Sequence, residues 1–158
     1  MSKFTIESEK LKNEKLIIAS DHAGFFLKEK IIKYLEGEQY EVKDIGCFSA
    51  ELPVDYPDYG HQLAKAIVAK EYDFGISICG TGNGISMTVN KHRGIRGALC
   101  WSEEISRLSR AHNDANVCSL PARFISESEA LLIVKTFLNT SFDGGRHALR
   151  IEKIQAVD

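Results

Sequence analysis

Short apolar runs alternate along the chain with longer segments in which apolar residues recur every three or four positions. The short runs are rich in β-branched residues, which is typical of buried strands. We predict five strands, at residues 15–20, 40–45, 73–79, 95–100 and 116–120. The longer segments predict helices at residues 24–36, 58–70, 83–91, 102–111 and 126–139, and a further helix in the tail at 146–157.

The helical segments carry the apolar stripe of a helix that packs on a sheet. The clearest stripes are Leu27, Ile31 and Leu35 on the first helix and Leu131, Val134 and Leu138 on the fifth. In the tail, Leu149 and Ile154 are the expected apolar anchors. The strands are too short and too apolar to be half exposed. The pattern therefore predicts an α/β fold, with a parallel sheet covered by helices on both faces.

Composition narrows the class of protein. The chain has 158 residues, of which 44% are hydrophobic and 27% charged, and we expect one domain at residues 15–158 after a loose N-terminal extension at 1–14. A formal net charge of −2 offers no basic surface for nucleic acid, and no segment has the ~20 apolar residues that span a bilayer. The start is charged and lacks the apolar core of a signal peptide, which predicts a cytoplasmic protein.

Four cysteines are scattered along the chain, at Cys47, Cys79, Cys100 and Cys118. None of them forms a C-x-x-C pair, so the sequence indicates neither a zinc site nor a redox pair. A cytoplasmic protein keeps its thiols reduced.

Polar residues gather where the predicted strands end. Asp21 and His22 follow the first strand, and Arg123 follows the fifth. In parallel α/β sheets, ligands bind at the carboxyl ends of the strands. The helix before the fifth strand ends in "RAHNDAN", and we expect it to bring His112 and Asn113 to the same rim. Each of these residues alone could be a helix cap or a turn residue, but their joint location favours a binding site.

The stretch "ICGTGNGIS" places Cys79 at the end of the third strand, directly before glycines at alternate positions. Such glycines let successive backbone N–H groups turn toward one point, and the helix that follows adds its positive end. The turn is therefore a candidate site for an anion, in a field that also favours the thiolate of Cys79. The alternative is a buried cysteine before an ordinary glycine turn.

Three familiar motifs do not match this turn. A dinucleotide-binding fingerprint needs a third glycine where Ile85 stands, and a cysteine phosphatase loop needs an arginine at that same position. The phosphate-binding loop of nucleotide hydrolases needs a lysine before Ser86, and none is present. The remaining interpretation is a cradle for a transient oxyanion beside a thiol, which suits proton abstraction next to a carbonyl.

Six motifs together resemble ribose-5-phosphate isomerase B, of the wider family that includes galactose-6-phosphate isomerase subunits. They are "SDHAGF", "DYPDYG", "ICGTGNGIS", "NKHRGIRGALC", "LSRAHNDANV" and "FDGGRHALRIEKI", in order along the chain from Leu16 to Val157. The resemblance implies a three-layer αβα sandwich of Rossmann type and a homodimer or dimer of dimers. It also implies interconversion of ribose 5-phosphate and ribulose 5-phosphate, in the non-oxidative pentose phosphate pathway, without metal or other cofactor.

The resemblance further implies roles for individual residues. Cys79 matches the proton-abstracting cysteine, and His112, with Thr81 nearby, matches the histidine that assists ring opening. The turn of Gly80, Thr81, Gly82, Asn83 and Gly84 matches the loop that binds the enediolate, although many members carry an apolar residue at position 83. Sugar-binding positions match Asp21, His22 and Asn113, and the arginine set matches Arg123, Arg146 and Arg150. The implied site lies between subunits, with Cys79 and Asp21 facing the partner copy's His112 and Asn113.

The residues support this assignment independently. Arg146 and Arg150 are four positions apart, on one face of the predicted tail helix, where guanidinium groups would bind a phosphate dianion. The alternative for these arginines is a solvated basic turn. Tyr56 is expected either to line the pocket or to pack in the core, and His61 and His92 are expected to have structural roles. No cluster of His, Asp and Glu has the spacing of metal ligands, so we expect no metal.

Two alternative functions stay open from the sequence. One is an isomerase of a six-carbon sugar phosphate, such as galactose 6-phosphate or allose 6-phosphate, because the size of the pocket after the second strand decides the substrate. The other is a non-catalytic nucleotide-binding or receiver-type module. A receiver would need a phosphorylatable aspartate at the end of the third strand, where Cys79 stands.

Overall fold

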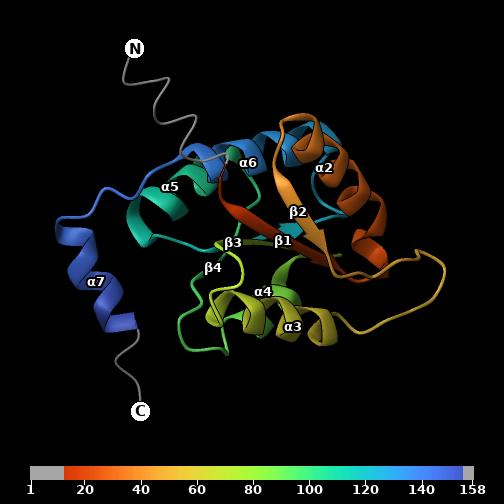
Figure 1. Cartoon of the computed structure of the whole chain (residues 1–158), viewed down its shortest axis with the longest axis horizontal. Coiled ribbons are helices and arrows are strands. Elements are labelled where there is room, and N and C mark those ends of the chain that lie inside the picture. Colours follow the sequence, from red (N-terminus) through yellow and green to blue (C-terminus); the bar gives the residue numbers. More distant parts are fainter. Residues whose placement is uncertain (1–12, 155–158) are drawn as a thin grey trace.

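Strands and helices alternate through residues 13–154, the part of the chain that the computed structural model describes (Figure 1). The elements are β1 (Lys15–Ser20), η1 (His22–Gly24), α2 (Phe25–Gly37), β2 (Glu41–Asp44), α3 (Tyr56–Val68), β3 (Phe74–Cys79), α4 (Asn83–Val89), β4 (Gly97–Leu99), α5 (Glu103–Asn113), β5 (Val117–Pro121), α6 (Glu127–Asn139) and α7 (Arg146–Ile154). The five strands and six helices predicted from the sequence are all present, with boundaries that differ by a few residues. Residues 1–12 of the extension expected at 1–14, and the end of the predicted tail helix after Ile154, lie outside the described residues.

The five strands form one parallel sheet in the order β2-β1-β3-β5-β4. Ile18 pairs with Ile76, which in turn pairs with Cys118, so one register row crosses the centre of the sheet. The order reverses direction between β1 and β3. In doubly wound sheets, the crevice at such a switch point is where ligands bind.

Helices cover both faces of the sheet, which confirms the predicted αβα sandwich. Figure 1 shows α2, α5 and α6 on one side and α3 and α4 on the other. Alternate residues of β1 enter the two cores, because Leu16 and Ile18 pack with α2 and α6, whereas Ile17 and Ala19 pack with α3 and α4. Both faces of β1 are therefore apolar, as a doubly covered parallel strand requires. None of the helices in residues 13–154 is long and apolar enough to cross a membrane.

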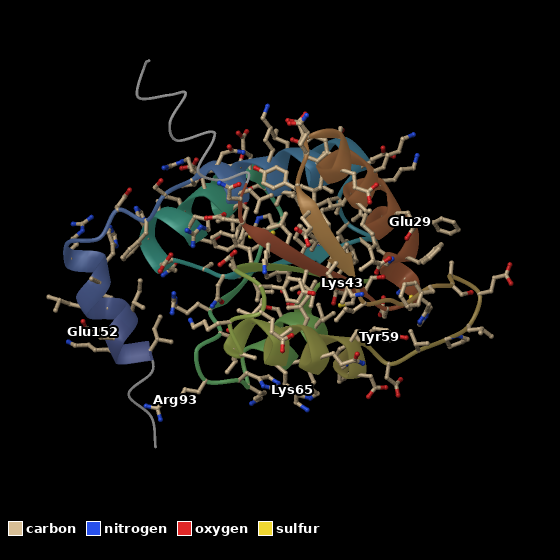
Figure 2. All side chains as sticks on the ribbon, in the orientation of Figure 1. Glu29, Lys43, Tyr59, Lys65, Arg93 and Glu152 are labelled. Atoms are coloured by element: carbon tan, nitrogen blue, oxygen red, sulfur yellow. The ribbon has the colours of Figure 1, made fainter. Side chains whose placement is uncertain are left out.

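The last helix, α7, differs from its expected packing. Leu149 is 63% exposed and Ile154 is 53% exposed, whereas His147 is the buried residue of this helix. The expectation that Leu149 and Ile154 anchor α7 is therefore wrong for a single chain. The helix lies at one end of the molecule beside α5 (Figure 1), and in Figure 2 its Glu152 is far from Tyr59 and Lys65 on α3. Within residues 13–154, little covers Leu149 and Ile154.

A buried ion pair joins α2 to the end of β2. The side chain of Lys28 is fully buried, and its Nζ lies 2.5 Å from Oδ2 of Asp44 and 2.8 Å from Oε1 of Glu29. The other carboxylate oxygen of Asp44 accepts a hydrogen bond from the backbone N–H of Gly46 (2.9 Å). The ring of Phe48 lies 5.6 Å from Nζ. Asp44 therefore ties the start of the loop after β2 to Lys28 on α2.

The two members of this pair should differ in their effect on stability. Asp44→Asn keeps the shape but leaves a fully buried ammonium with Glu29 alone, and we expect a loss of about 3 kcal/mol in the free energy of unfolding. Lys28→Met removes the buried charge, keeps much of the apolar stem, and leaves a partly exposed carboxylate that water can solvate. Its loss should be nearer about 1 kcal/mol. Urea unfolding of both variants at one protein concentration measures the difference, and a larger loss for Lys28→Met would contradict the assignment.

Candidate active site

The segment after β1 is held against β3. The backbone N–H of Asp21 donates to the carbonyl of Ile78 (3.1 Å), and its carboxylate accepts from the N–H of Gly24 (3.1 Å). Gly24 lies so close to β3 that a Cβ there would be 2.7 Å from Cγ2 of Ile78. Asp21 is consequently almost buried at the carboxyl edge of the sheet.

His22 is oriented by the loop that follows β2. Nδ1 of His22 lies 3.2 Å from the backbone nitrogen of Val54 and 3.3 Å from its carbonyl oxygen. The loop thus fixes the position of a histidine beside Asp21. The sequence predicts this pair as a binding element, and the structure brings the two residues to one edge.

The turn after β3 needs its glycines for close approach. Gly82 has a φ of +72°, in the left-handed region, and a Cβ there would be 2.5 Å from Cδ1 of Leu99. A Cβ at Gly84 would be 2.4 Å from Cζ of Tyr56, so the tyrosine ring lies directly against the turn. Cys79 ends β3 immediately before these residues and is 4% exposed. Tyr56 thus contacts the candidate oxyanion loop, which is the first of its two expected placements.

Arg123 brings a positive charge to the same turn. Its backbone N–H donates to the carbonyl of Gly80 (3.0 Å), and the N–H of Ala122 donates to the carbonyl of Cys79 (2.9 Å). A Cβ on Gly80 would lie 3.1 Å from Nη1 of Arg123, so the guanidinium lies over this glycine. A thiol, a row of backbone N–H groups and a guanidinium are therefore close together at the carboxyl edge.

An open cavity of about 280 Å³ adjoins the turn. Its walls are formed by Thr81, Asn83, Leu99, Trp101, Pro121 and Phe124. Oγ1 of Thr81 accepts from the backbone N–H of Asn83 (3.3 Å), which fixes the threonine at the start of α4. Trp101 and Phe124 are 56% and 72% exposed, an unusual state for large apolar side chains.

Two arginines fix the end of α5. Asp114 caps the helix with a φ of +44°, and its carboxylate is bound by Nη1 of Arg110 (2.7 Å) and Nη2 of Arg96 (3.0 Å). Nε of Arg96 also donates to the carbonyl of Asn113 (3.0 Å). A left-handed aspartate costs about 1 kcal/mol, which these charged contacts offset. His112 and Asn113 are therefore presented by a rigid turn.

The ring of His112 stacks on that of His147 from α7, with ring centroids 4.2 Å apart and planes 9° apart. Nε2 of His112 lies 3.9 Å from Oδ2 of Asp143. Arg146 and Arg150 are exposed on the same helix. Asp143 and the stacking role of His147 were missed by sequence reasoning, and the only sequence signal is the Gly144-Gly145 pair that turns the chain back into α7.

The three side chains of this cluster could also be considered as metal ligands. Among the described residues, His112, Asp143 and His147 form the one such group, with ligand atoms within 4.8 Å of one another. The stacked rings place their nitrogen lone pairs in parallel planes, and these do not converge on one point as a tetrahedral ion requires. The absence of a metal stays a prediction.

The two groups of candidate residues lie at opposite edges of the sheet in a single chain. Pro121, at the carboxyl end of β5, pairs with Cys79, whereas α5 ends three residues before β5 begins. The five residues of β5 span roughly 16 Å. The expectation that His112 and Asn113 share a rim with Cys79 in one chain is therefore wrong, because a helix that leads into a parallel strand must end at the amino edge.

His61 and His92 lie away from both groups. Nδ1 of His61 and Nε2 of His92 are 2.7 Å apart, and this contact joins α3 to the segment after α4. Burial, with His61 and then Lys65 nearby, lowers the pKa of His92. The contact is a hydrogen bond between two segments at the surface, which agrees with the expected structural role of both histidines.

Comparison with known proteins identifies the family. The model of the ribose/galactose isomerase family matches residues 16–154. Ribose-5-phosphate isomerase B of Escherichia coli is 42% identical over 145 residues, which cover 92% of this chain and 97% of that protein.

Solved structures agree with the sequence comparison. The crystal structure of a ribose 5-phosphate isomerase from Thermotoga maritima is 52% identical, with a TM-score of 0.90 over 92% of this chain and 99% of that one. The Mycoplasma genitalium enzyme, crystallised with bound ribulose-5-phosphate, is 43% identical, with a TM-score of 0.85 over 89% of this chain and 93% of that one. The chain therefore belongs to the ribose/galactose isomerase family, and it is an isomerase.

Proposed function

We propose that this chain interconverts D-ribose 5-phosphate and D-ribulose 5-phosphate through an enediolate. The observation that carries the proposal is the glycine turn, which places backbone N–H groups and the Arg123 guanidinium beside Cys79 at the switch point of the sheet. The ribulose-5-phosphate bound in the structure of the Mycoplasma genitalium relative supports the choice of substrate.

The chemistry requires a ring opening and then two proton transfers at carbon. His112, with Thr81, moves a proton from the anomeric hydroxyl to the ring oxygen as the bond between C1 and that oxygen breaks. The Cys79 thiolate removes the proton from C2 and returns it to C1, while the hydroxyl proton of O2 passes to O1. The N–H groups from Gly80 to Gly84 hold the negative charge of the enediolate between these two steps.

The remaining polar residues would hold the substrate. Arg146 and Arg150 are exposed on one face of α7, and guanidinium pairs bind phosphate dianions through charge-assisted hydrogen bonds. Asp21, with its position fixed by Gly24, and His22, with its position fixed by Val54, would bind sugar hydroxyls. Asn113 is exposed beside His112 and would do the same.

The proposed site needs a second copy of the chain. The thiol and the His112 group lie at opposite edges of the sheet, and a twofold neighbour can bring the two edges together. Trp101 and Phe124, beside the turn, and Leu149, on α7, are large apolar side chains with little cover. Their exposure in a single chain supports a homodimer, or a dimer of dimers, that covers them and forms sites between subunits.

We propose no metal or cofactor, and no nucleic-acid or membrane partner. Proton transfer through a thiol needs no Lewis acid, and the net charge of −2 gives no basic surface. The four cysteines are all free and buried, which suits a reducing compartment and supports action in the cytoplasm.

Replacement of the proposed base tests the assignment. Cys79→Ala should lower kcat for ribose 5-phosphate by about 10²-fold to 10⁴-fold, because a positioned base contributes that much. Binding of a non-reacting phosphate ligand should stay within about twofold, since the arginines are unchanged. Turnover is followed by ribulose 5-phosphate formation, and binding by calorimetry.

The same assay on a panel of aldose phosphates tests the substrate. The wild-type chain should have its highest kcat/KM with ribose 5-phosphate. Higher values with allose 6-phosphate or galactose 6-phosphate would show that the substrate is a six-carbon sugar phosphate.

For the variant experiment, near-normal turnover by Cys79→Ala would show that the thiol is not the base.

The isotope content of the product separates proton transfer from hydride shift. In D₂O, deuterium should enter ribulose 5-phosphate at C1, because a thiol exchanges its proton with solvent between the two steps. Prior treatment with a chelator should leave the rate unchanged. Loss of activity with chelator, restored by a divalent ion and accompanied by retention of substrate hydrogen, would instead indicate hydride shift at a metal.

Mixing two inactive variants tests the shared site. In a mixed dimer of Cys79→Ala and His112→Ala chains, one site carries both defects and the other carries neither. With random pairing, half of the dimers are mixed and half of their sites are intact, so activity should recover to roughly a quarter of wild type. If native mass spectrometry shows mixed dimers and activity does not rise, both residues act within one chain.

A further inference from the structure

The segment between α6 and α7 is attached directly to the end of α5. The backbone N–H of Asp143 donates to the carbonyl of Ala111 (2.9 Å), one of the last carbonyls of α5, which have no partner within the helix. Ala111 immediately precedes His112 in the chain. The Asp143 backbone is therefore fixed relative to the histidine, and its carboxylate faces Nε2 of that ring at 3.9 Å.

A glycine pair then brings α7 back onto the same ring. Gly144 and Gly145 have φ values of +66° and +55°, and two consecutive left-handed residues are accessible to glycine at low cost. The N–H of His147 donates to the carbonyl of Gly144 (3.1 Å) at the start of α7. The imidazole of His147 then lies over that of His112. His147 is 9% exposed, whereas the side chain of His112 is 39% exposed. One face of the His112 ring is covered and the rest stays accessible.

Charges around the stacked rings differ in sign. Arg146 and Arg150 lie on α7, and α5 contributes Glu104 and Arg107, which pair with each other at 2.7 Å. Burial lowers the pKa of His147, and His112 and the two α7 arginines lower it further, whereas Asp143 acts in the opposite direction. His147 is therefore a neutral stacking partner. Arg107, and to a smaller extent His112, lower the pKa of the Glu104 carboxyl, so Glu104 also acts on the ring, but Asp143 is the carboxylate with an oxygen within 4.0 Å of it.

We propose that Asp143 is a positioning residue for ring opening, whose carboxylate, 3.9 Å from Nε2 of His112, favours the tautomer with its proton on that nitrogen, while the stacked His147 fixes the plane of the ring. The inference rests on the proposed function. Nδ1 of His112 then accepts the proton of the anomeric hydroxyl, C1=O forms as the bond from C1 to the ring oxygen breaks, and the imidazolium returns that proton to the ring oxygen. The carboxylate stabilises the imidazolium while it exists, as in other carboxylate-imidazole pairs. Protons balance, and His112 ends neutral.

Ribose 5-phosphate and ribulose 5-phosphate allow ring opening to be measured separately from proton transfer at carbon. Ribose 5-phosphate is a furanose that must open before Cys79 can act. Ribulose 5-phosphate carries its phosphate on O5, so it cannot close a five-membered ring and stays open. Exchange of its C1 hydrogen with D₂O therefore requires the thiol and the glycine turn but not the opening of a ring.

Asp143→Asn should lower kcat for ribose 5-phosphate about tenfold, a modest effect because the carboxylate is partly solvated, while C1 exchange in ribulose 5-phosphate stays within about twofold of wild type. Asp143→Glu should recover most of the turnover. Glu104→Gln removes the other carboxylate near His112, which pairs with Arg107 and acts on the ring only at longer range, and both of its rates should stay within about twofold of wild type.

Four results would overturn the assignment. Equal falls of both rates in Asp143→Asn would show a structural role, and unchanged rates would show no role. A defect in Glu104→Gln of the same size and selectivity would show a general charge effect. Absence of both rates in the wild-type chain would overturn the proposed function, and the role of Asp143 with it, whereas Cys79→Ala should abolish exchange and turnover together.

Discussion

All five strands run in the same direction, and this constraint decides where each functional group is placed. Every loop that follows a strand emerges at the carboxyl edge, and every helix that leads into a strand ends at the amino edge. Cys79 belongs to the first class and His112 to the second. No change of side-chain rotamer can bring the two together across the length of β5. An isomerase that uses both must therefore join the two edges of different copies, which a twofold axis does twice in one dimer.

Each edge keeps its groups in place through one backbone conformation that an L-residue rarely adopts. At the carboxyl edge it is Gly82, where Leu99 leaves no room for a Cβ. At the amino edge it is Asp114, which carries a side chain and is held by Arg96 and Arg110. The two solutions differ because the glycine turn must let backbone N–H groups approach a ligand, whereas the turn after α5 must present the side chain of its neighbour.

The fold could be predicted from the sequence because its strands are apolar on both faces. The limits of β1 match the predicted run, and β3 differs by one residue, since continuous β-branched runs leave little choice. β4 has only three residues, although Arg96 and Cys100 on either side of it also form backbone hydrogen bonds with the β5 segment. The stripe on α7 indicated burial of Leu149 and Ile154, but a pattern cannot say which chain provides the cover. These residues are exposed in a single copy.

The carboxyl half of the site was also readable, because the thiol and the glycines are consecutive in sequence. His112 was predicted to lie at the carboxyl ends of the strands, and this was wrong. α5 leads into β5, so the end of α5 lies at the amino end of that strand. The contact of His112 with Asp143 and His147 joins segments about thirty residues apart, and no local periodicity encodes it.

The stacking of His147 on His112 connects two proposed roles of α7, phosphate binding and support of the ring-opening histidine. Arg146 and Arg150 lower the pKa of His147 and would oppose a positive charge on the stacked ring of His112. A phosphate dianion bound to these arginines would neutralise them at the moment when the ring-opening imidazolium forms. Substrate binding and proton transfer would then be coupled through one helix, and a sugar without phosphate would lack both the anchor and the compensating charge.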